Sequence, residues 1–264
     1  MVNNIILEIC CGSVDGCIIA QKMGADRIEL NHALELGGTT PSIGTLIEAK
    51  KHTNIPIICM VRPRGVGYFH SEEEFSAMLF DVKNLIDHGA DGIIFGFLHE
   101  DGTIDIERTR IFVDAIHPKQ AVFSKAFDKV SNQESALQTL IECGVDRVLT
   151  SGGAMSLDEK HSKVALGEVD AALALLRHLQ QTYGDKIELL PAGGIRAHNV
   201  AHIIETTGIT QVHTAAREMK LDPSSTHFMK QGDSIDNYRY SATSPTVLSE
   251  ILEALLKEDN EQIT

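Results

Sequence analysis

The stretch GADRIEL at residues 24–30 decides the fold, because the chain repeats its pattern three more times. GADGIIF begins at Gly89, GVDRVLT at Gly144 and GITQVHT at Gly208, at intervals of 65, 55 and 64 residues. Each copy combines the glycine that ends a helix, a short turn and then a strand. An interval of about 60 residues has room for two units of strand and helix. The repeat therefore predicts regularly alternating strands and helices.

Short apolar runs supply the remaining strands. They lie at residues 5–10 (IILEIC), 56–61 (PIICMV), 121–126 (AVFSKA) and 187–192 (IELLPA), and a helical pattern follows each one, as it follows each copy of the repeat. Apolar runs without alternation are typical of strands covered on both faces by helices. Eight such units in about 250 residues predict an α/β fold, a (β/α)8 TIM barrel. A doubly wound open sheet is the alternative.

The chain reads as a single domain over residues 1–264. We expect the barrel at about 5–257 and a frayed tail at 258–264. An extra loop at about 216–244 separates the eighth strand from the last helix. A loop of this length in a compact domain is either functional or a surface excursion that caps the barrel.

Composition excludes several classes of partner. The net charge of −14 and the pI near 5.2 disfavour nucleic acid and anionic membrane surfaces, which need a basic face. No apolar run approaches the roughly 18–20 residues of a membrane span, and the first residues lack a signal-peptide layout. The five cysteines are then expected to be reduced thiols in a cytoplasmic protein.

In a barrel of this kind the active site lies at the C-terminal ends of the strands. Because side chains alternate along a strand, three pairs at these ends share a face: Glu8 with Cys10, Glu29 with Asn31, and Arg62 with Arg64. If these faces point inward, two carboxylates meet two guanidinium groups at the barrel mouth. Cys59 has the opposite register and should face the helices.

Two interpretations of this mouth remain open. In one it is a pocket for a small anion, since arginine binds carboxylate or phosphate bidentately. In the other a closed network of glutamate and arginine plugs the barrel. For the pocket, the candidate acids and bases are Glu8, Glu29, His213 and Asp128. The candidate ligand-binding residues are Arg62, Arg64, Asn31, Ser124, Ser151, Gly152, Gly193 and Gly194.

The glycines in that set have their own reason and their own alternative. Gly152 follows the sixth strand, and Gly193 and Gly194 follow the seventh. Glycine lets the backbone approach a phosphate at the start of the next helix, but the same residues also suit tight turns. Lys125 has the opposite register to Ser124, so we expect it to form a salt bridge with the helix layer.

The motifs LEICCGS, GADRIELN, GGTTPSIG, VRPRG, GADGIIFG, AFD, RVLTSGG, PAGGIR and VHTAAR occur in this order between residues 7 and 217. In this series the chain resembles the copper homeostasis protein CutC family. The resemblance implies a TIM-type barrel, a cytoplasmic location and a role in copper handling through cysteine. It also suggests a homodimer.

The chain departs from the family pattern at the barrel mouth. Family members often have cysteine where this chain has Asn31, so a two-cysteine copper(I) site would retain Cys10 as its metal ligand. The family pattern FHRAFD is FSKAFD at residues 123–128, and RPRGGD is RPRGVG at residues 62–67. Three hypotheses follow: a copper(I)-binding protein, a barrel enzyme or sensor for a phosphorylated or carboxylated metabolite, and a non-catalytic scaffold.

Overall fold

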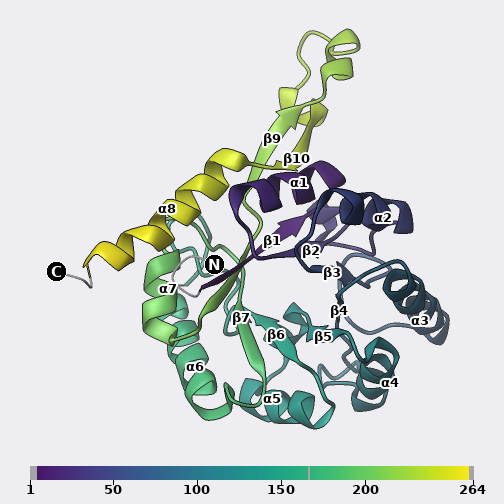
Figure 1. Cartoon of the computed structure of the whole chain (residues 1–264), viewed down its shortest axis with the longest axis vertical. Helices are drawn as coiled ribbons and strands as arrows, with labels where there is room; N and C mark the ends of the chain where they lie inside the picture. The colour runs from purple at the N-terminus through teal and green to yellow at the C-terminus, as the bar shows by residue number, and fades with distance from the viewer. Residues whose placement is uncertain (1–4, 166, 262–264) are drawn as a thin grey trace.

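The computed structural model describes residues 5–165 and 167–261, and within them the predicted (β/α)8 barrel is confirmed (Figure 1). The barrel strands are β1 Ile6–Cys11, β2 Arg27–Leu30, β3 Ile57–Met60, β4 Gly92–Phe95, β5 Gln120–Phe123, β6 Arg147–Thr150, β7 Glu188–Pro191 and β8 Gln211–Thr214. The helices are α1 Val14–Met23, α2 Ile43–His52, α3 Glu72–Asp87, α4 Ile106–Ile116, α5 Gln133–Glu142, α6 Glu168–Tyr183, α7 Val200–Thr207 and α8 Pro245–Glu261.

The parallel strands are hydrogen-bonded in the order β7-β6-β5-β4-β3-β2-β1-β8. This order follows the chain around a ring and lacks the reversal of a doubly wound sheet. Side chains join the two end strands: Gln211 Nε2 donates to Glu188 Oε2 at 3.3 Å. At the other end of the junction Thr214 Oγ1 donates to the carbonyl of Ile195 at 3.0 Å.

The repeated glycines end helices, as predicted. Gly24, Gly89, Gly144 and Gly208 have φ angles of 96°, 100°, 80° and 71° and follow α1, α3, α5 and α7. Glycine adopts this left-handed conformation without a side-chain clash, so each helix stops there and the chain turns into the next strand.

The aspartate of each GAD or GVD segment then fixes the register of two strands. The N–H of Asp91 donates to the carbonyl of Ile57 at 2.9 Å, and its carboxylate accepts the N–H of Ile57 at 2.8 Å. The same pair of bonds joins Asp26 with Leu7 and Asp146 with Ala121. Three neighbouring strand pairs therefore start in the same alignment, which determines which residues point into the barrel.

The apolar core forms two clusters, one inside the ring of strands and one outside it. The side chains of one fill part of the barrel interior: Ile58, Met60, Ile94, Val122, Leu149, Leu190 and Ala192. The other cluster lies between the strands and the helices and contains Cys59, so the predicted outward register of Cys59 is confirmed. On the side of β1, β2 and β8 the interior is polar, with Glu8 beside Arg27 and His213 in the strand register.

The expected loop at 216–244 is in part regular structure. β9 Arg217–Leu221 and β10 Arg239–Thr243 form an antiparallel hairpin with two short 3-10 turns, Pro223–His227 and Ile235–Tyr238, between them. Figure 1 shows this arm projecting away from the barrel. The prediction of an irregular loop is therefore wrong for the two strands. The two strands are short, and the many turn residues between them make their strand pattern hard to recognise in the sequence.

The last helix extends into the predicted tail. Helix α8 continues to Glu261, beyond the start of the tail expected at 258–264, and residues 262–264 lie outside the described part of the chain. Across the described residues, no helix combines the length and apolar character that a membrane crossing requires.

Gly92→Ala should lower the stability of the barrel. An added Cβ would lie 2.6 Å from the carbonyl oxygen of Gln120 and 2.8 Å from Ile58. Overpacking of this kind costs roughly 1–3 kcal/mol of unfolding free energy. Urea denaturation measures the change. The matched control is Gly44→Ala on α2, where the nearest side-chain atom is 3.8 Å away, and it should leave stability unchanged or slightly raised. Equal stability of both variants would contradict close packing around Gly92.

Candidate metal- and anion-binding site at the barrel mouth

A cavity of about 450 Å³ opens at the C-terminal ends of the barrel strands. Cys10, Glu29, Asn31 and His213 line its inner wall. A larger cavity, of about 900 Å³, lies outside the barrel between residues of α3, α4 and α5. The smaller cavity is the stronger candidate site, because ligands of such barrels bind where the strands end and because buried titratable groups converge there.

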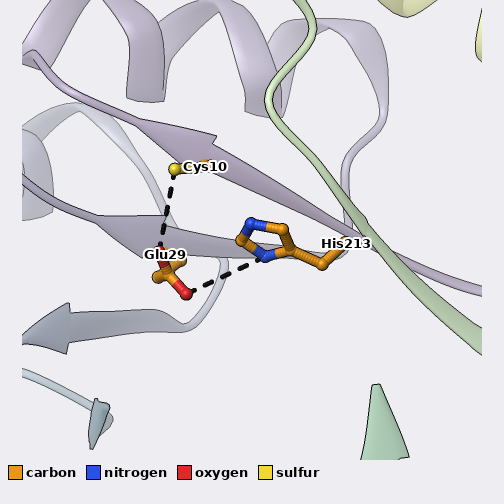
Figure 2. A group of neighbouring side chains, drawn as sticks. All are labelled: Cys10, Glu29 and His213. Atoms are coloured by element: carbon orange, nitrogen blue, oxygen red, sulfur yellow. Dashed lines mark hydrogen bonds and ion pairs between the residues drawn. The ribbon is translucent and has the colours of Figure 1, made fainter. Parts of the chain in front are cut away.

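Cys10, Glu29 and His213 all line this cavity and approach one another from three neighbouring strands (Figure 2). Cys10 Sγ lies 3.7 Å from Glu29 Oε1, and His213 Nδ1 lies 3.9 Å from Glu29 Oε2. One ligand atom from each residue falls within 4.8 Å of the other two. The three side chains are buried and offer a thiol, a carboxylate and an imidazole to a single point.

Glu8 contacts this group through His213 and carries a fixed negative charge. Its Oε1 accepts a hydrogen bond from His213 Nδ1 at 2.8 Å, and its Oε2 accepts one from Arg27 Nε. Burial alone would raise the pKa of Glu8, but the Arg27 guanidinium and His213 together hold it at about 2. Glu8 is therefore ionised at neutral pH.

The three converging side chains hold their protons more tightly than usual. Burial lowers the pKa of His213, but the carboxylates of Glu29 and Glu8 outweigh it and raise this pKa well above its ordinary value. Burial and the nearby Glu8 charge raise the pKa of Glu29. Burial and Glu29 raise the pKa of Cys10. At neutral pH the site therefore contains a thiol and an imidazolium.

Asn31, which stands where members of the family often have cysteine, also belongs to this group. Its Nδ2 donates to Glu29 Oε1 at 2.6 Å and lies 3.5 Å from Cys10 Sγ. The predicted same-face pairs Glu8 with Cys10 and Glu29 with Asn31 thus both point inward.

Several buried polar atoms at this mouth have no hydrogen-bond partner. Among the described residues these atoms are Glu29 Oε2, Asn31 Oδ1, Arg62 Nε and His70 Nε2, and the first three belong to residues that line the cavity. An unsatisfied buried polar atom costs about 1–3 kcal/mol. Their concentration in one cavity is what a ligand-binding site requires, because a ligand can pair with them.

The two arginines have other partners than the predicted ones. Arg62 lines the cavity, where its Nη1 donates to the carbonyls of Gly37 at 3.3 Å and Gly38 at 3.4 Å. Arg64 forms an ion pair with Glu74 at 2.7 Å. The expected contact of both arginines with Glu8 and Glu29 is wrong, because β3 ends at Met60 and strand alternation no longer applies beyond it.

The residues after β5 also leave the predicted strand. Ser124 caps a 3-10 turn at Lys125–Lys129, so Lys125 points into the cavity and lies 3.6 Å from Asp128 Oδ2. This corrects the expected contact of Lys125 with the helix layer. Asp128 accepts hydrogen bonds from Thr150 Oγ1 at 2.6 Å and from Ser151 Oγ at 2.8 Å. Its carboxylate thus holds the turn after β6.

The remaining predicted residues divide between the cavity and the turn. Ser124, Gly193 and Gly194 line the cavity, whereas Ser151 and Gly152 belong to the turn that Asp128 holds. Sequence reasoning missed several lining residues: Met60, Tyr68, Lys129, Arg196 and Arg217. Met60 has the same strand register as Ile58, and Arg196 and Arg217 end the motifs PAGGIR and VHTAAR. These signals could have identified them.

Comparisons with known proteins agree with the fold and with the motifs. A model of the CutC family matches residues 5–218. A Treponema denticola protein named as a family protein CutC is 43% identical over 221 residues, covering 84% of this chain and 85% of that protein. The human copper homeostasis protein cutC homolog is 38% identical over 218 residues, covering 83% of this chain and 76% of that protein.

Solved structures give the same result. A CutC crystal structure from Streptococcus agalactiae superposes with a TM-score of 0.70 at 27% identity and covers 79% of this chain and 97% of that one. N-(5′-phosphoribosyl)anthranilate isomerase from Pyrococcus furiosus has a TM-score of 0.54 at 15% identity, covering 96% of this chain and 99% of that one. The second likeness concerns the barrel fold alone.

Glu8→Gln should remove part of the acid sensitivity of the protein. The folded-state pKa of Glu8, about 2, lies below its ordinary value of 4.5, so its contribution is complete above about pH 4.5 and is lost as the pH falls towards 2. In wild type this loss should be on the order of 3 kcal/mol of unfolding free energy. Urea denaturation between about pH 5 and pH 2 measures it.

The variant should also be less stable near neutral pH, because Arg27 loses its buried counter-charge. Glu205→Gln, at an exposed position of α7, is the control and should reproduce the wild-type pH profile. A wild-type profile in Glu8→Gln would show that Glu8 is not the buried charge described above.

Proposed function

The chain belongs to the CutC family, as its motifs predicted, and we propose that it takes part in copper homeostasis by binding Cu(I) through Cys10 at the barrel mouth. The observation that carries this proposal is the convergence of Cys10, Glu29 and His213 beside buried polar atoms that lack partners. The copper homeostasis names of the human and mouse relatives agree with it.

The donor atoms suit Cu(I). Thiolate and thioether sulfur are the soft ligands that select this ion, and imidazole also binds copper. Cys10, Met60 and His213 line one cavity and supply these three groups. All five cysteines are free thiols, and Cys10 is the one that lines this cavity. A reduced, cytoplasmic setting would suit both the free thiols and the cuprous ion.

Proton transfer is the chemistry that this chain would contribute to copper binding. The Cys10 thiol donates to Glu29 Oε1 across 3.7 Å, so Glu29 is positioned to accept the thiol proton when the sulfur becomes a ligand. The raised pKa of Glu29 makes it a better acceptor than an ordinary carboxylate. Arrival of the cation and departure of the proton would then leave the buried charge nearly balanced.

His213 is prepared for metal binding by Glu8. The Nδ1 proton is held by Glu8 Oε1 at 2.8 Å, which leaves Nε2 as the atom that loses its proton and binds. In Figure 2 this second ring nitrogen lies towards Cys10. A carboxylate behind a ligating histidine fixes the orientation of the ring and makes the ligand more basic.

A second candidate function is binding of a small phosphorylated or carboxylated metabolite, by an enzyme or a sensor. The observation that favours it is the charge of the cavity wall, which contains Arg62, Lys125, Lys129, Arg196 and Arg217. Arg62 Nε has no hydrogen-bond partner there. In this proposal Arg62 binds the anion, Glu29 or His213 moves a proton, and Arg64 supports the loop through Glu74.

The homodimer stays a prediction from the family resemblance.

Cys10→Ser should weaken Cu(I) binding by at least about 100-fold, because a hydroxyl is a poor ligand for this soft ion. Competition with a chromogenic Cu(I) chelator measures the affinity. Cys143→Ser, at the end of α5, is the matched control and should bind as wild type does. Asn31→Cys would add a second thiol beside Cys10 Sγ and should bind more tightly. Equal affinity of wild type and Cys10→Ser would remove Cys10 as the ligand.

The affinity for Cu(I) should also rise with pH. The pKa values of Cys10 and His213 both lie above their ordinary values, so both groups must lose protons when they become ligands. The same chelator competition between about pH 6 and pH 8 measures this dependence. In Cys10→Ser the dependence should become shallower. An affinity that falls over this range in wild type would contradict a thiol ligand.

The metabolite proposal has a separate test. Inorganic phosphate and a panel of phosphorylated and carboxylated metabolites are screened for an increase in the melting temperature of wild type. A ligand at 100 times its Kd adds about 2.7 kcal/mol of stability. Arg62→Ala should abolish the increase, whereas Arg239→Ala on the β10 arm should preserve it. An unchanged increase in Arg62→Ala would contradict this assignment.

A further inference from the structure

A second group of metal-ligating side chains lies outside the barrel mouth. Asp158 and His161 belong to the long segment between β6 and α6, and His198 lies just before α7. His161 Nδ1 is 3.1 Å from Asp158 Oδ2, and His198 Nε2 is 3.2 Å from Asp158 Oδ1. The two imidazole rings have centroids 5.4 Å apart. Neither the family resemblance nor the proposed copper site uses these residues.

Hydrogen bonds that do not involve these three side chains hold the neighbouring residues Leu157 and Asn199 in place. The N–H of Leu157 donates to the carbonyl of Gly193 at 2.8 Å. Asn199 Nδ2 donates to the carbonyls of Leu157 and Gly194, each at 2.9 Å. These bonds fasten the segment onto the turn between β7 and α7, so Asp158 and His198 are brought together although they are 40 residues apart.

Asp158 is oriented by its own loop. Its Oδ1 accepts the backbone N–H groups of Lys160 at 3.1 Å and His161 at 3.2 Å. Burial opposes ionisation, but the hydrogen bonds from His161 and the charge interactions with both histidines lower the pKa of Asp158. The carboxylate is thus ionised, directed and 4% exposed, while the side chains of His161 and His198 are 70% and 27% exposed.

We propose that Asp158, His161 and His198 form a binding site for a divalent transition-metal ion, with Zn²⁺ as the representative ion. Zinc bonds to nitrogen and oxygen are about 2.0–2.2 Å long, so at tetrahedral angles two ligand atoms lie roughly 3.3 Å apart. Measured to the same oxygen, Asp158 Oδ1, His161 Nδ1 lies at 3.3 Å and His198 Nε2 at 3.2 Å, which is close to this value. Small movements of the two imidazoles therefore suffice to admit the ion.

The composition of the site selects its ion. Two imidazoles and one carboxylate form a borderline set that suits Zn²⁺ and related divalent ions, whereas the sulfur groups at the barrel mouth suit Cu(I). Three protein ligands leave the fourth position of a tetrahedral ion for water, and the exposed His161 opens that position to solvent. The two sites therefore divide by ligand softness and by access.

The site also has a defined relation to the barrel mouth. Gly193 and Gly194, onto which the Asp158 segment is fastened, line the cavity that contains Cys10. A bound ion would link the segment after β6 to the start of α7 behind this wall. Zinc binding should therefore stabilise the wall of the cavity without adding a ligand to the cavity itself.

The test uses the full chain carrying Cys10→Ser, so that zinc binding at the barrel mouth is weakened. Zn²⁺ alone is titrated by calorimetry, and its affinity is confirmed by competition with a chromogenic chelator. We expect one equivalent to bind. His161→Gln and His198→Gln should each weaken zinc binding by at least about 100-fold. Loss of a residue that only supports a ligand weakens metal binding by roughly 10- to 100-fold, and loss of a ligand should have at least the larger of these effects.

His178→Gln is the matched control, because His178 also pairs with a carboxylate. Its Nε2 lies 3.3 Å from Glu134 Oε1, and this is a single pair rather than a group of three side chains. It should bind zinc as the Cys10→Ser parent does. Melting temperatures without metal show whether each variant is folded, and the exposed His161 is the safest position to change. Replacing Zn²⁺ with Co²⁺ should give a visible absorption spectrum that disappears in His161→Gln.

Two outcomes would overturn the proposal. The first is the absence of any stoichiometric zinc binding in the Cys10→Ser parent, which would leave the three side chains as a hydrogen-bonded cluster only. The second is an equal affinity in the parent, His161→Gln and His198→Gln, which would place the ion elsewhere. Neither result would affect the Cu(I) proposal, which is tested with a different ion and by comparing wild type with Cys10→Ser.

Discussion

The buried charge of Glu8 is the interaction on which the barrel mouth depends. One carboxylate holds Arg27 on β2 and His213 on β8, so it joins the two strands that flank β1. Removing one partner of a buried pair leaves an uncompensated charge, which costs about 3–5 kcal/mol. The same contact determines which nitrogen of His213 keeps its proton. Glu8 thus contributes to the closure of the barrel and to the chemistry of the cavity above it.

The protonation of the cavity follows from that charge and from burial. Glu29 and the ionised Glu8 keep the proton on His213, and burial together with Glu8 makes Glu29 harder to ionise. Burial and Glu29 keep Cys10 a thiol. In the proposed function this site would exchange protons for a metal cation, so that binding would respond to pH. The basic residues Arg62 and Arg217 line the same cavity. The copper proposal and the anion proposal therefore concern one and the same cavity.

The departures from the family pattern have physical consequences at the barrel mouth. Asn31 replaces a thiol by a donor that satisfies Glu29 Oε1 and contacts Cys10 Sγ. The loss of one soft ligand gives Met60 and His213 greater weight in any copper site. The long segment after β6 brings Asp158 to His198 and is fastened to Gly193 and Gly194, which line the cavity. This member of the family thus has one cysteine at the barrel mouth and a second group of nitrogen and oxygen side-chain atoms at Asp158, His161 and His198.

By itself the sequence determined the barrel, the family and the inward direction of Cys10, Glu29 and Asn31. These properties are local: a glycine ends a helix, an aspartate aligns the next two strands, and side chains alternate along each strand. Only the tertiary structure decided the partners of the charges. Arg62, Arg64 and Lys125 lie beyond their strands, where alternation ends, and their contacts depend on the loops around them. The pair of Glu8 and His213 spans 205 residues and forms only when β8 closes the ring against β1. Contacts of this range result from barrel closure, which no local pattern in the chain encodes.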